Sequence, residues 1–379
     1  MDLNDLRTKI DKTDDALVRL ISDRMDIAAE IAAFKKENNL PVFHPERERE
    51  KLADVLTKTR EDLQSSMQVI YQLLFELSRS HQNSLLGAES PESALVAQAL
   101  EETPKEFPRR ANVVCQGVEG AYSSIAAERL FSLPSIQYVG SFDAAFSAVE
   151  HGFCDYAVLP IENSSAGSVK QVYDSMVRRH FYIVRSVRLK IDHSLLAKPG
   201  VKLEDVREVL SHEQALTQCG DWLQKLGVKT TPCENTAVAA KTVAESDRTD
   251  LAALSSTRCA ELYGLKVLQR DMQDNANNHT RFICVSSKPQ IFPGADRTSL
   301  MMILPHRPGS LYKALAKFYA LGINLLKLES RPLPERDFEF MFYFDLETSV
   351  YSSEFRRLLS ELGEISEEFR YLGSYSEVM

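Results

Sequence analysis

The sequence predicts a multidomain chain in which an all-helical unit is followed by an α/β unit and then by a unit with ferredoxin-like strand order. In the first part, apolar residues recur at helical spacing over long stretches. From residue 112 onward, short apolar runs alternate with helical stretches. The last part reads strand, helix, strand, strand, helix, strand. We expect the helical unit at residues 1–90, a linker at 91–110, the α/β unit at 111–289 and the ferredoxin-like unit at 298–379.

The composition is that of an ordinary globular protein. With 379 residues, 44% hydrophobic and 26% charged, the chain can bury more than one sizeable core. Its net charge of -9, with dispersed basic residues, argues against nucleic-acid binding. Six cysteines without a C-x-x-C pair or a histidine cluster indicate reduced thiols. No apolar run has the length of a signal peptide or a membrane span. We therefore expect a soluble cytoplasmic protein with no metal, no cofactor and no membrane contact.

The helical unit is expected to contain three helices. Helical spacing extends from about Asn4 to Asn38, a second helix begins near Pro45, and a third runs from about Ser65 to Leu86. The first of these helices would be about 50 Å long. Because three helices of such unequal length cannot form a compact monomer, we expect a homodimer in which the helices are shared between chains.

Two cations lie inside the apolar stripe of the first helix. Arg24 and Lys35 differ by only about 20° around the helix axis, so they face the same way. Ser78 and Gln82 interrupt the apolar stripe of the third helix in the same manner. The simplest interpretation is a polar pocket within the bundle that binds a small anion.

Arg7 faces elsewhere on the same helix. It lies about 25 Å from Arg24 along the axis and points about 100° away, so it would reach the pocket of a partner chain more easily than its own. An alternative interpretation has no pocket. Long cationic side chains extend out of a bundle and pair with acids such as Asp14 or Asp26, and helix spacing alone favours that alternative slightly.

A larger set of polar residues belongs to this helical unit: Arg7, Arg24, Lys35, Arg47, Glu48, Ser78 and Gln82. Together with Pro41-Val42 they resemble the all-helical chorismate mutases over nearly ninety residues. The resemblance implies that the three arginines hold the two carboxylates of chorismate with help from Ser78. It implies that Lys35 and Gln82 donate to the ether oxygen, whose negative charge grows as its bond breaks. Glu48 would accept from the ring hydroxyl.

His44 departs from the pattern of the family that the helical unit resembles. It aligns with the loop position after the first helix where bacterial two-activity enzymes usually have Asp. We include His44 among the residues expected to bind chorismate.

The α/β unit is predicted from short apolar strands at 112–115, 156–159, 206–210, 251–254 and 282–285, with helices at 123–131 and 214–226. Polar or glycine-rich segments adjoin these strands at 117–124, 160–168, 211–214 and 277–282. The first lacks the third glycine of a dinucleotide-binding turn, and the third lacks the second histidine of a zinc-protease helix. Donors at helix starts suit a small carboxylate, although ordinary helix caps, a strand threonine and a surface arginine would have the same pattern.

Taken together, these four segments resemble prephenate dehydratase, with the third match extending as a Ser-His-Gln-Ala-Gln-Cys pattern across 211–219. The hallmark of that family is the triplet Thr280-Arg281-Phe282. The resemblance implies two lobes like those of periplasmic binding proteins, with the site in the cleft. Thr280 would be the residue most needed for catalysis, and Arg281 would hold a carboxylate. Prephenate loses carbon dioxide and a hydroxyl group together, so the site needs a donor at the leaving oxygen. Thr280 suits that role, with Glu162, Asn163 and Ser164 as alternatives and further prephenate contacts.

The ferredoxin-like unit is predicted from a strand at 299–304 and helices at 309–321 and 353–362, with three more strands. Its segments 308–312 and 328–332 read alone as a capped helix and a turn. With the strand order, they resemble the ACT regulatory domain, which binds phenylalanine between paired domains. A glycine at a helix start suits a carboxylate, and a glutamate suits an ammonium group. The residues implied in phenylalanine binding are Gly309, Ser310, Leu311, Glu329, Ser330 and Arg331.

The three resemblances occur in consecutive units, which implies a bifunctional chorismate mutase and prephenate dehydratase with a phenylalanine-sensing tail. The expected ligands are chorismate, prephenate and L-phenylalanine. One alternative is a non-enzymatic binding protein built on the same lobes, and another is a scaffold whose helices only dimerise. The intact Thr280 argues against the first alternative. Cations within an apolar stripe are costly for mere dimerisation, which argues against the second.

Overall fold

The computed structural model describes residues 2–86, 90–275, 277–333 and 339–378. The chain forms two compact units, one of Met1–Ser93 with Arg356–Ile365, and the other of Ala94–Phe355 with Ser366–Met379. The α/β and ferredoxin-like regions were expected as separate domains. Most residues of both regions belong to the second unit. Within the described ranges, no helix is both long and apolar enough to cross a membrane.

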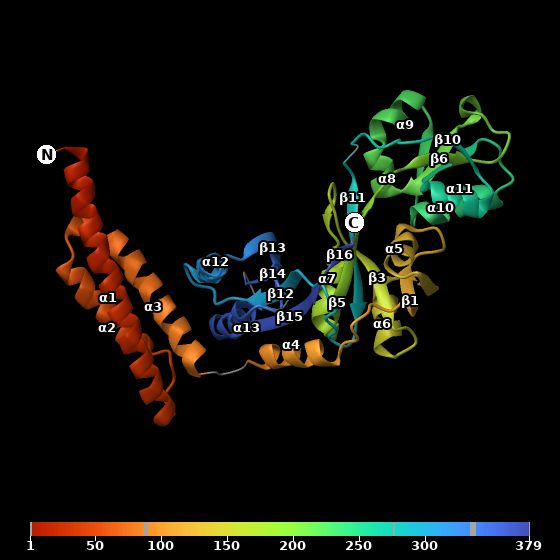
Figure 1. Ribbon diagram of the computed structural model, residues 1–379. Helices are drawn as coiled ribbons and strands as arrows, with labels where there is room; N and C mark the ends of the chain where they lie inside the picture. The colour runs from red at the N-terminus through yellow and green to blue at the C-terminus, as the bar shows by residue number, and fades with distance from the viewer. Residues whose placement is uncertain (1, 87–89, 276, 334–338, 379) are drawn as a thin grey trace. The chain divides into compact units, whose positions relative to one another are not determined.

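The first unit contains the three predicted helices. They are α1 (Leu3–Glu37), α2 (Pro45–Lys58) and α3 (Gln64–Leu86), with the short 3-10 helix η1 (Glu61–Leu63) before α3. α1 begins at a reciprocal capping box between Asp2 and Asp5, and it ends before Asn39, whose φ is 50°. α3 runs alongside α1 (Figure 1). In 35 residues α1 buries only Ala28 and Ala32, so most of its surface has no cover within one chain.

The segment expected as a linker contains a helix. α4 (Pro91–Glu102) has Pro91 at its first position, where a missing N–H costs nothing. Val96 and Ala99 are buried, and Thr103 Oγ1 accepts from Ile291 N at 3.0 Å. Pro91, which indicated a linker, is therefore the first residue of a helix. Apolar residues of the same segment are packed and not exposed.

The first lobe of the second unit is built on a seven-stranded sheet. Six strands follow the order β16-β5-β11-β3-β1-β2, and β4 pairs with β3. β1 pairs in parallel with β2 and β3, whereas β11 runs antiparallel between β3 and β5. The bounds are β1 (Arg110–Gln116), β2 (Leu133–Val139), β3 (Tyr156–Asn163), β4 (Gly167–Ser168), β5 (Tyr182–Lys190), β11 (His279–Ser286) and β16 (Glu377–Val378), with α5 (Tyr122–Leu130), α6 (Phe142–Glu150) and α7 (Lys170–Arg179).

The second lobe has a five-stranded sheet in the order β10-β6-β9-β7-β8. The helix predicted at 214–226 is split at Cys219, which ends α8 and precedes α9. The bounds are β6 (Ser194–Ala197), β7 (Glu208–His212), β8 (Lys229–Cys233), β9 (Leu251–Ser255) and β10 (Lys266–Gln269), with η2 (Leu203–Asp205), α8 (Glu213–Gln218), α9 (Gly220–Leu226), α10 (Thr236–Glu245) and α11 (Thr257–Tyr263). Two chain crossings, after β5 and before β11, connect the lobes.

The last sheet has the order β13-β14-β12-β15, as the ferredoxin-like prediction requires. The bounds are β12 (Arg297–Ile303), α12 (Ser310–Ala320), β13 (Asn324–Pro332), β14 (Phe340–Glu347), α13 (Ser353–Ile365) and β15 (Glu368–Tyr375). β15 passes so close to β5 that a Cβ added to Gly373 would lie 2.2 Å from Ile183 O. Only glycine fits at this position. β16 then pairs in parallel with β5, which extends the seven-stranded sheet. The predicted fold class is confirmed.

Candidate active sites

The cations of α1 meet polar groups of α3 and of the loop after α1. Arg24 Nη1 donates to Leu74 O at 3.2 Å and also to Ser78 Oγ. Lys35 Nζ donates to Val42 O at 2.5 Å and lies 3.5 Å from Gln82 Oε1. Ser78 and Gln82 are buried. The polar residues that interrupt the apolar stripes of α1 and α3 therefore face each other.

Glu48 of α2 completes this cluster and is held by a residue that the sequence analysis missed. Arg79 forms ion pairs with Glu48 and, at 2.7 Å, with Glu76. Its guanidinium also lies over the Phe43 ring, 5.0 Å from the ring centroid. Its position next to Ser78 on α3 was the available signal. Arg79 fixes the carboxylate of Glu48 beside the cations of α1.

Burial sets the electrostatics of the cluster. It lowers the pKa of Lys35 and of Arg24, and the charge of Glu48 opposes part of both shifts. A lowered pKa means that the surroundings disfavour the positive charge of each group. An anion bound beside Arg24 and Lys35 would relieve that unfavourable charge, so the cluster is suited to an anionic ligand.

The remaining predicted residues of the helical unit lie at its surface. Arg7 is exposed on α1, and Arg47 is exposed and pairs with Glu50 at 3.4 Å. His44 is the N-cap of α2, where its Nδ1 accepts from Arg47 N at 3.3 Å. This is a helix-capping contact that an Asp side chain would also make. One chain thus assembles Arg24, Lys35, Glu48, Ser78 and Gln82, while Arg7 and Arg47 remain exposed.

A cavity of about 320 Å³ is lined by residues of both lobes of the second unit. Its volume suits a small organic acid. The polar residues that line it are Gln116, Tyr122, Ser123, Asn163, His193, His212, Gln214, Gln218, Asn235, Thr236 and Thr280. The 117–124, 160–168, 211–214 and 277–282 segments of the sequence analysis each contribute at least one of these residues.

The pairing of β3 with β11 decides which predicted residues reach the cavity. Thr280 lies opposite Asn163, and Arg281 lies opposite Glu162. Since neighbouring residues of a strand point to opposite faces, the two pairs face different ways. Thr280 and Asn163 line the cavity. The structure therefore separates Thr280 from Arg281, which the sequence analysis had placed in one site.

Asn163 fixes the orientation of the Thr280 hydroxyl. Asn163 Oδ1 accepts from Ser165 N at 3.0 Å and from Ala166 N at 2.9 Å, so Nδ2 must be the donor end of the amide. Nδ2 donates to Thr280 Oγ1 at 2.9 Å and to Asn278 Oδ1 at 2.8 Å. Because Thr280 Oγ1 accepts this hydrogen bond, its own hydrogen is left to donate to a ligand.

The hydrogen bonds continue to two cavity residues that the sequence analysis missed. Gln218 Oε1 accepts from Asn278 Nδ2 at 2.9 Å and lies 3.2 Å from His193 Nε2. A carbonyl oxygen can only accept, so His193 Nε2 carries a hydrogen. Burial lowers the pKa of His193, which favours the neutral ring. For His193 the available signal was weak: one histidine in the otherwise mostly apolar segment 191–197, which matches no motif. For Gln218 the signal was the 211–219 pattern that contains it.

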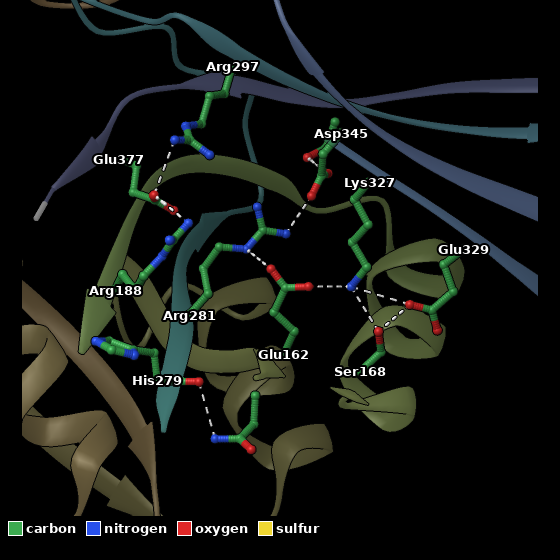
Figure 2. A network of polar contacts seen from close by, with 12 residues as sticks. Glu162, Ser168, Arg188, His279, Arg281, Arg297, Lys327, Glu329, Asp345 and Glu377 are labelled. Atoms are coloured by element: carbon green, nitrogen blue, oxygen red, sulfur yellow. Dashed lines mark hydrogen bonds and ion pairs between the residues drawn. The ribbon is translucent and has the colours of Figure 1, made fainter. Parts of the chain in front are cut away.

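Arg281 and Glu162 lie in an ion-pair network on the opposite face (Figure 2). Arg281 pairs with Glu162 at 2.7 Å and with Asp345 at 2.5 Å. Glu162 also pairs with Lys327 at 2.5 Å. Ser164 braces the neighbouring turn by donating to Asn277 O at 2.9 Å. Glu162, Ser164 and Arg281 are not among the described residues that line the cavity, and their contact with prephenate stays a prediction.

The residues expected to bind phenylalanine lie on α12 and β13. Gly309 is the N-cap of α12 with φ 85°, a left-handed conformation that favours glycine, and Ser310 and Leu311 follow it. Glu329 bonds to Ser168 and lies 3.3 Å from Lys327, while Arg331 pairs with Asp174 at 3.1 Å. Ser330 is exposed between them. A ligand amine at Glu329 would compete with Lys327.

Comparisons with known proteins match both regions of the chain. Residues 6–83 match the family Chorismate mutase type II, and residues 113–290 match the family Prephenate dehydratase. A bifunctional chorismate mutase/prephenate dehydratase of Escherichia coli is 32% identical over 98% of this chain and 95% of its own. An arogenate dehydratase/prephenate dehydratase of Arabidopsis thaliana is 43% identical over 70% of this chain and 73% of its own. A solved prephenate dehydratase from Arthrobacter aurescens in complex with L-Phe has a TM-score of 0.63 and 31% identity, covering 70% of this chain and 90% of that one.

Proposed function

This chain belongs to the family of bifunctional chorismate mutase/prephenate dehydratases, and we propose how its residues carry the two reactions. It is an enzyme of phenylalanine biosynthesis that rearranges chorismate to prephenate and then converts prephenate to phenylpyruvate. One observation supports the assignment of the reactions to the two units: each unit gathers the residues that its own reaction needs.

In the mutase reaction, the ether bond breaks as a carbon–carbon bond forms, without proton transfer. We assign Arg24, with Ser78, to one substrate carboxylate and Lys35 and Gln82 to the ether oxygen. Gln82 Oε1 faces Lys35 Nζ, so Gln82 Nε2 remains available to donate. Donors fixed in place before the reaction stabilise the growing negative charge without a reorganisation cost.

The other chorismate contacts are assigned to Glu48, Arg47 and His44, together with Arg7 of a partner chain. Glu48, oriented by Arg79, would accept from the ring hydroxyl. The exposed Arg47 would hold the second carboxylate, with Arg7 of the partner. His44 would act near the hydroxyl while it caps α2.

A homodimer is proposed because α1 exposes so much apolar surface in one chain. Its exposed large hydrophobic residues include Leu3, Leu6, Ile10, Leu17, Val18, Leu20, Ile27, Ile31 and Phe34. A contiguous apolar surface of this kind indicates an interaction site. A two-fold partner packed on α1 would cover this surface. Arg7 lies about 25 Å along α1 from Arg24 of its own chain, and the same arrangement would bring it to the mutase site of the partner chain.

In the dehydratase reaction, the carbon–carbon bond to the ring carboxylate breaks and its electron pair moves into the ring. The carbon–oxygen bond then breaks toward the hydroxyl oxygen, which leaves as water after gaining a proton. We assign to Thr280 the hydrogen bond that stabilises the leaving oxygen, and to Asn163 the orientation of Thr280. Carbon dioxide, water and phenylpyruvate account for all the atoms of prephenate and the added proton.

Feedback inhibition by L-phenylalanine is proposed at Gly309–Leu311 and Glu329–Arg331 of an ACT regulatory domain. The related dehydratase solved with L-Phe supports this, as does the helix start after Gly309, whose N–H groups suit a carboxylate. We also propose a cytoplasmic location. All six cysteines are free thiols, which is typical of a reducing compartment.

Incubation of the full chain with chorismate tests the function directly. We expect prephenate to form first and phenylpyruvate to follow, with slower phenylpyruvate formation when L-phenylalanine is present. Accumulation of prephenate without phenylpyruvate would refute the dehydratase assignment, and unchanged rates with phenylalanine would refute the regulatory one. A parallel assay with arogenate determines whether the substrate named for the plant relative is also used.

A further inference from the structure

The β3–β11 ladder presents two residue pairs to two different surroundings. Asn163 and Thr280 face the cavity. Glu162 and Arg281, their immediate neighbours, face the ferredoxin-like sheet (Figure 2). The backbone links each cavity residue to a charged neighbour through a single peptide bond. Any shift of the charged pair is therefore transmitted to the pair that faces the substrate.

Two residues of the ferredoxin-like sheet hold this charged pair from the far side. Asp345 of β14 pairs with Arg281 at 2.5 Å and accepts from Ser299 Oγ at 2.6 Å. Arg281 and Asp345 are each only 5% exposed. Because neither side chain has water to replace its partner, loss of Asp345 would leave Arg281 with Glu162 alone, and loss of Arg281 would remove the cation from the buried Asp345. The Arg281–Asp345 contact is therefore hard to rearrange.

Lys327 of β13 holds the other member of the pair. Its Nζ lies 2.5 Å from Glu162 Oε2, 2.8 Å from Ser168 Oγ and 2.9 Å from the Tyr173 hydroxyl. An ammonium group has three hydrogens, and these contacts can use all of them. Ser168 belongs to β4, which pairs with the end of β3. Lys327 thus fixes the end of β3 at the residues next to Asn163.

β3 has a bulge beside these residues: Ile161 has no partner in β11, because Arg281 lies opposite Glu162 and Phe282 lies opposite Pro160. The register with β3 shifts between Arg281 and Phe282, directly after the Thr280–Arg281 step. Bulges of this kind redirect side chains and weaken the local ladder. Beside this bulge the β3–β11 ladder alone fixes the side chains less firmly, and the side-chain contacts of Glu162 and Arg281 add to the pairing that directs Thr280 to the cavity.

We propose that Lys327 and Asp345 are positioning residues for the dehydratase reaction. They act through Glu162 and Arg281, and they keep the Asn163–Thr280 hydrogen bond directed at the cavity. The ferredoxin-like sheet is thereby a structural part of the dehydratase site. The proposal rests on the assignment of Thr280 above, and its test compares variants with the wild-type rate, which is established first.

The test uses the full chain with Lys327→Met, Lys327→Arg and the exposed control Lys202→Met. Displacement of a catalytic group by about 1 Å costs up to about a hundredfold, so we expect Lys327→Met to lower the dehydratase kcat about tenfold to a hundredfold. KM for prephenate should change less than kcat, because Lys327 does not line the cavity. Lys327→Arg should recover most of the rate. The mutase rate of the same preparation should not change.

A double-mutant cycle between Lys327→Met and Glu162→Gln distinguishes positioning from general destabilisation. If Lys327 acts through Glu162, the two effects on kcat should be strongly non-additive. Additive effects, a wild-type kcat in Lys327→Met, or a rise in KM alone would overturn the proposal. If Lys327→Met does not fold, a double-mutant cycle between Asp345→Asn and Arg281→Lys tests the Arg281–Asp345 pair instead. Additive effects on the dehydratase kcat, an unchanged kcat in Asp345→Asn, or a rise in KM alone would again overturn the proposal.

Discussion

The two reaction sites of this enzyme differ in the kind of side chain that builds them. The helical unit sets the cations Arg24 and Lys35 against hydroxyl and amide groups of α3. The cavity of the second unit is lined by the neutral pair Asn163 and Thr280. A rearrangement without proton transfer is served by fixed charges, whereas loss of a hydroxyl group needs a hydrogen bond directed at the leaving oxygen. We therefore expect the first site to depend on charge and the second to depend on strand register.

Loss of a cation should have the largest effect. Lys35→Ala removes the ammonium proposed to stabilise the ether oxygen, so we expect the mutase kcat to fall about a thousandfold. The conversion of added prephenate to phenylpyruvate should not change. Both rates are measured on one preparation.

The adjacent Lys36→Ala is a matched control, because Lys36 is exposed on the same helix turn. It should retain both activities. Equal loss in Lys35→Ala and Lys36→Ala would contradict a specific role for Lys35, and loss of the dehydratase rate in Lys35→Ala would mean that the two sites are not independent.

The second site should be sensitive to the loss of a single hydroxyl group. Thr280→Val keeps the shape of the side chain and removes its donor, and we expect the dehydratase kcat to fall about a hundredfold. Thr280→Ser keeps the donor and should retain most of the rate. The unfolding temperature of the second unit serves as the folding control, because the mutase site lies in the other unit. A Thr280→Val enzyme with normal turnover would exclude Thr280 from the chemistry.

The sites should also differ in whether one chain suffices. If Arg7 serves the partner's site, Arg7→Ala and Arg24→Ala homodimers should each lose mutase activity. A mixed dimer would then contain one intact site, so mixing the two variants under subunit exchange should restore about a quarter of the wild-type rate. The dehydratase rate should be the same in every mixture. Absence of restored activity despite mixed dimers in native mass spectrometry would place Arg7 in its own chain's site.

The same difference explains which features the sequence revealed. Long helical periodicity predicted α1 and α3 closely, because an amphipathic helix repeats its signal over many turns. Arg24 and Lys35 could be identified because a cation in an apolar stripe conflicts with its surroundings. The ferredoxin-like order was also predicted correctly, since its elements follow one another along the chain.

Features that depend on neighbours distant in sequence were harder to find. The orientation of Arg281 away from Thr280 depends on the pairing of β11 with β3 and on the sheet behind them. His193 joins the site through hydrogen bonds between distant segments, with no motif around it, and Gln218 lies in the 211–219 pattern but was not predicted to line the site. α4 was missed because Pro91 marks a helix start as readily as a linker. Local patterns carry no information on these tertiary contacts.

The smallest predicted effect is a loss of mutase activity at alkaline pH. We expect this loss at the mutase site and not at the dehydratase site. Burial lowers the pKa of Lys35, and the role proposed for Lys35 in the mutase reaction needs its protonated form. The mutase kcat/KM should therefore fall about twofold at a pH below the ordinary pKa of lysine, where half of the Lys35 side chains have lost their proton. The pH–rate profile of the dehydratase reaction should not show this alkaline limb, which is the fall in rate caused by deprotonation of Lys35.

Protein stability should not decline with this loss of mutase activity. In the window between the lowered pKa of Lys35 and its higher value in the unfolded chain, the unfolded chain binds more protons, so the Lys35 contribution to stability rises with pH. Activity should thus fall while the unfolding temperature of the helical unit holds. Lys35→Arg, if active, should lack the limb because a guanidinium stays protonated. A limb that coincides with unfolding, or that persists in Lys35→Arg, would assign the alkaline loss to another group.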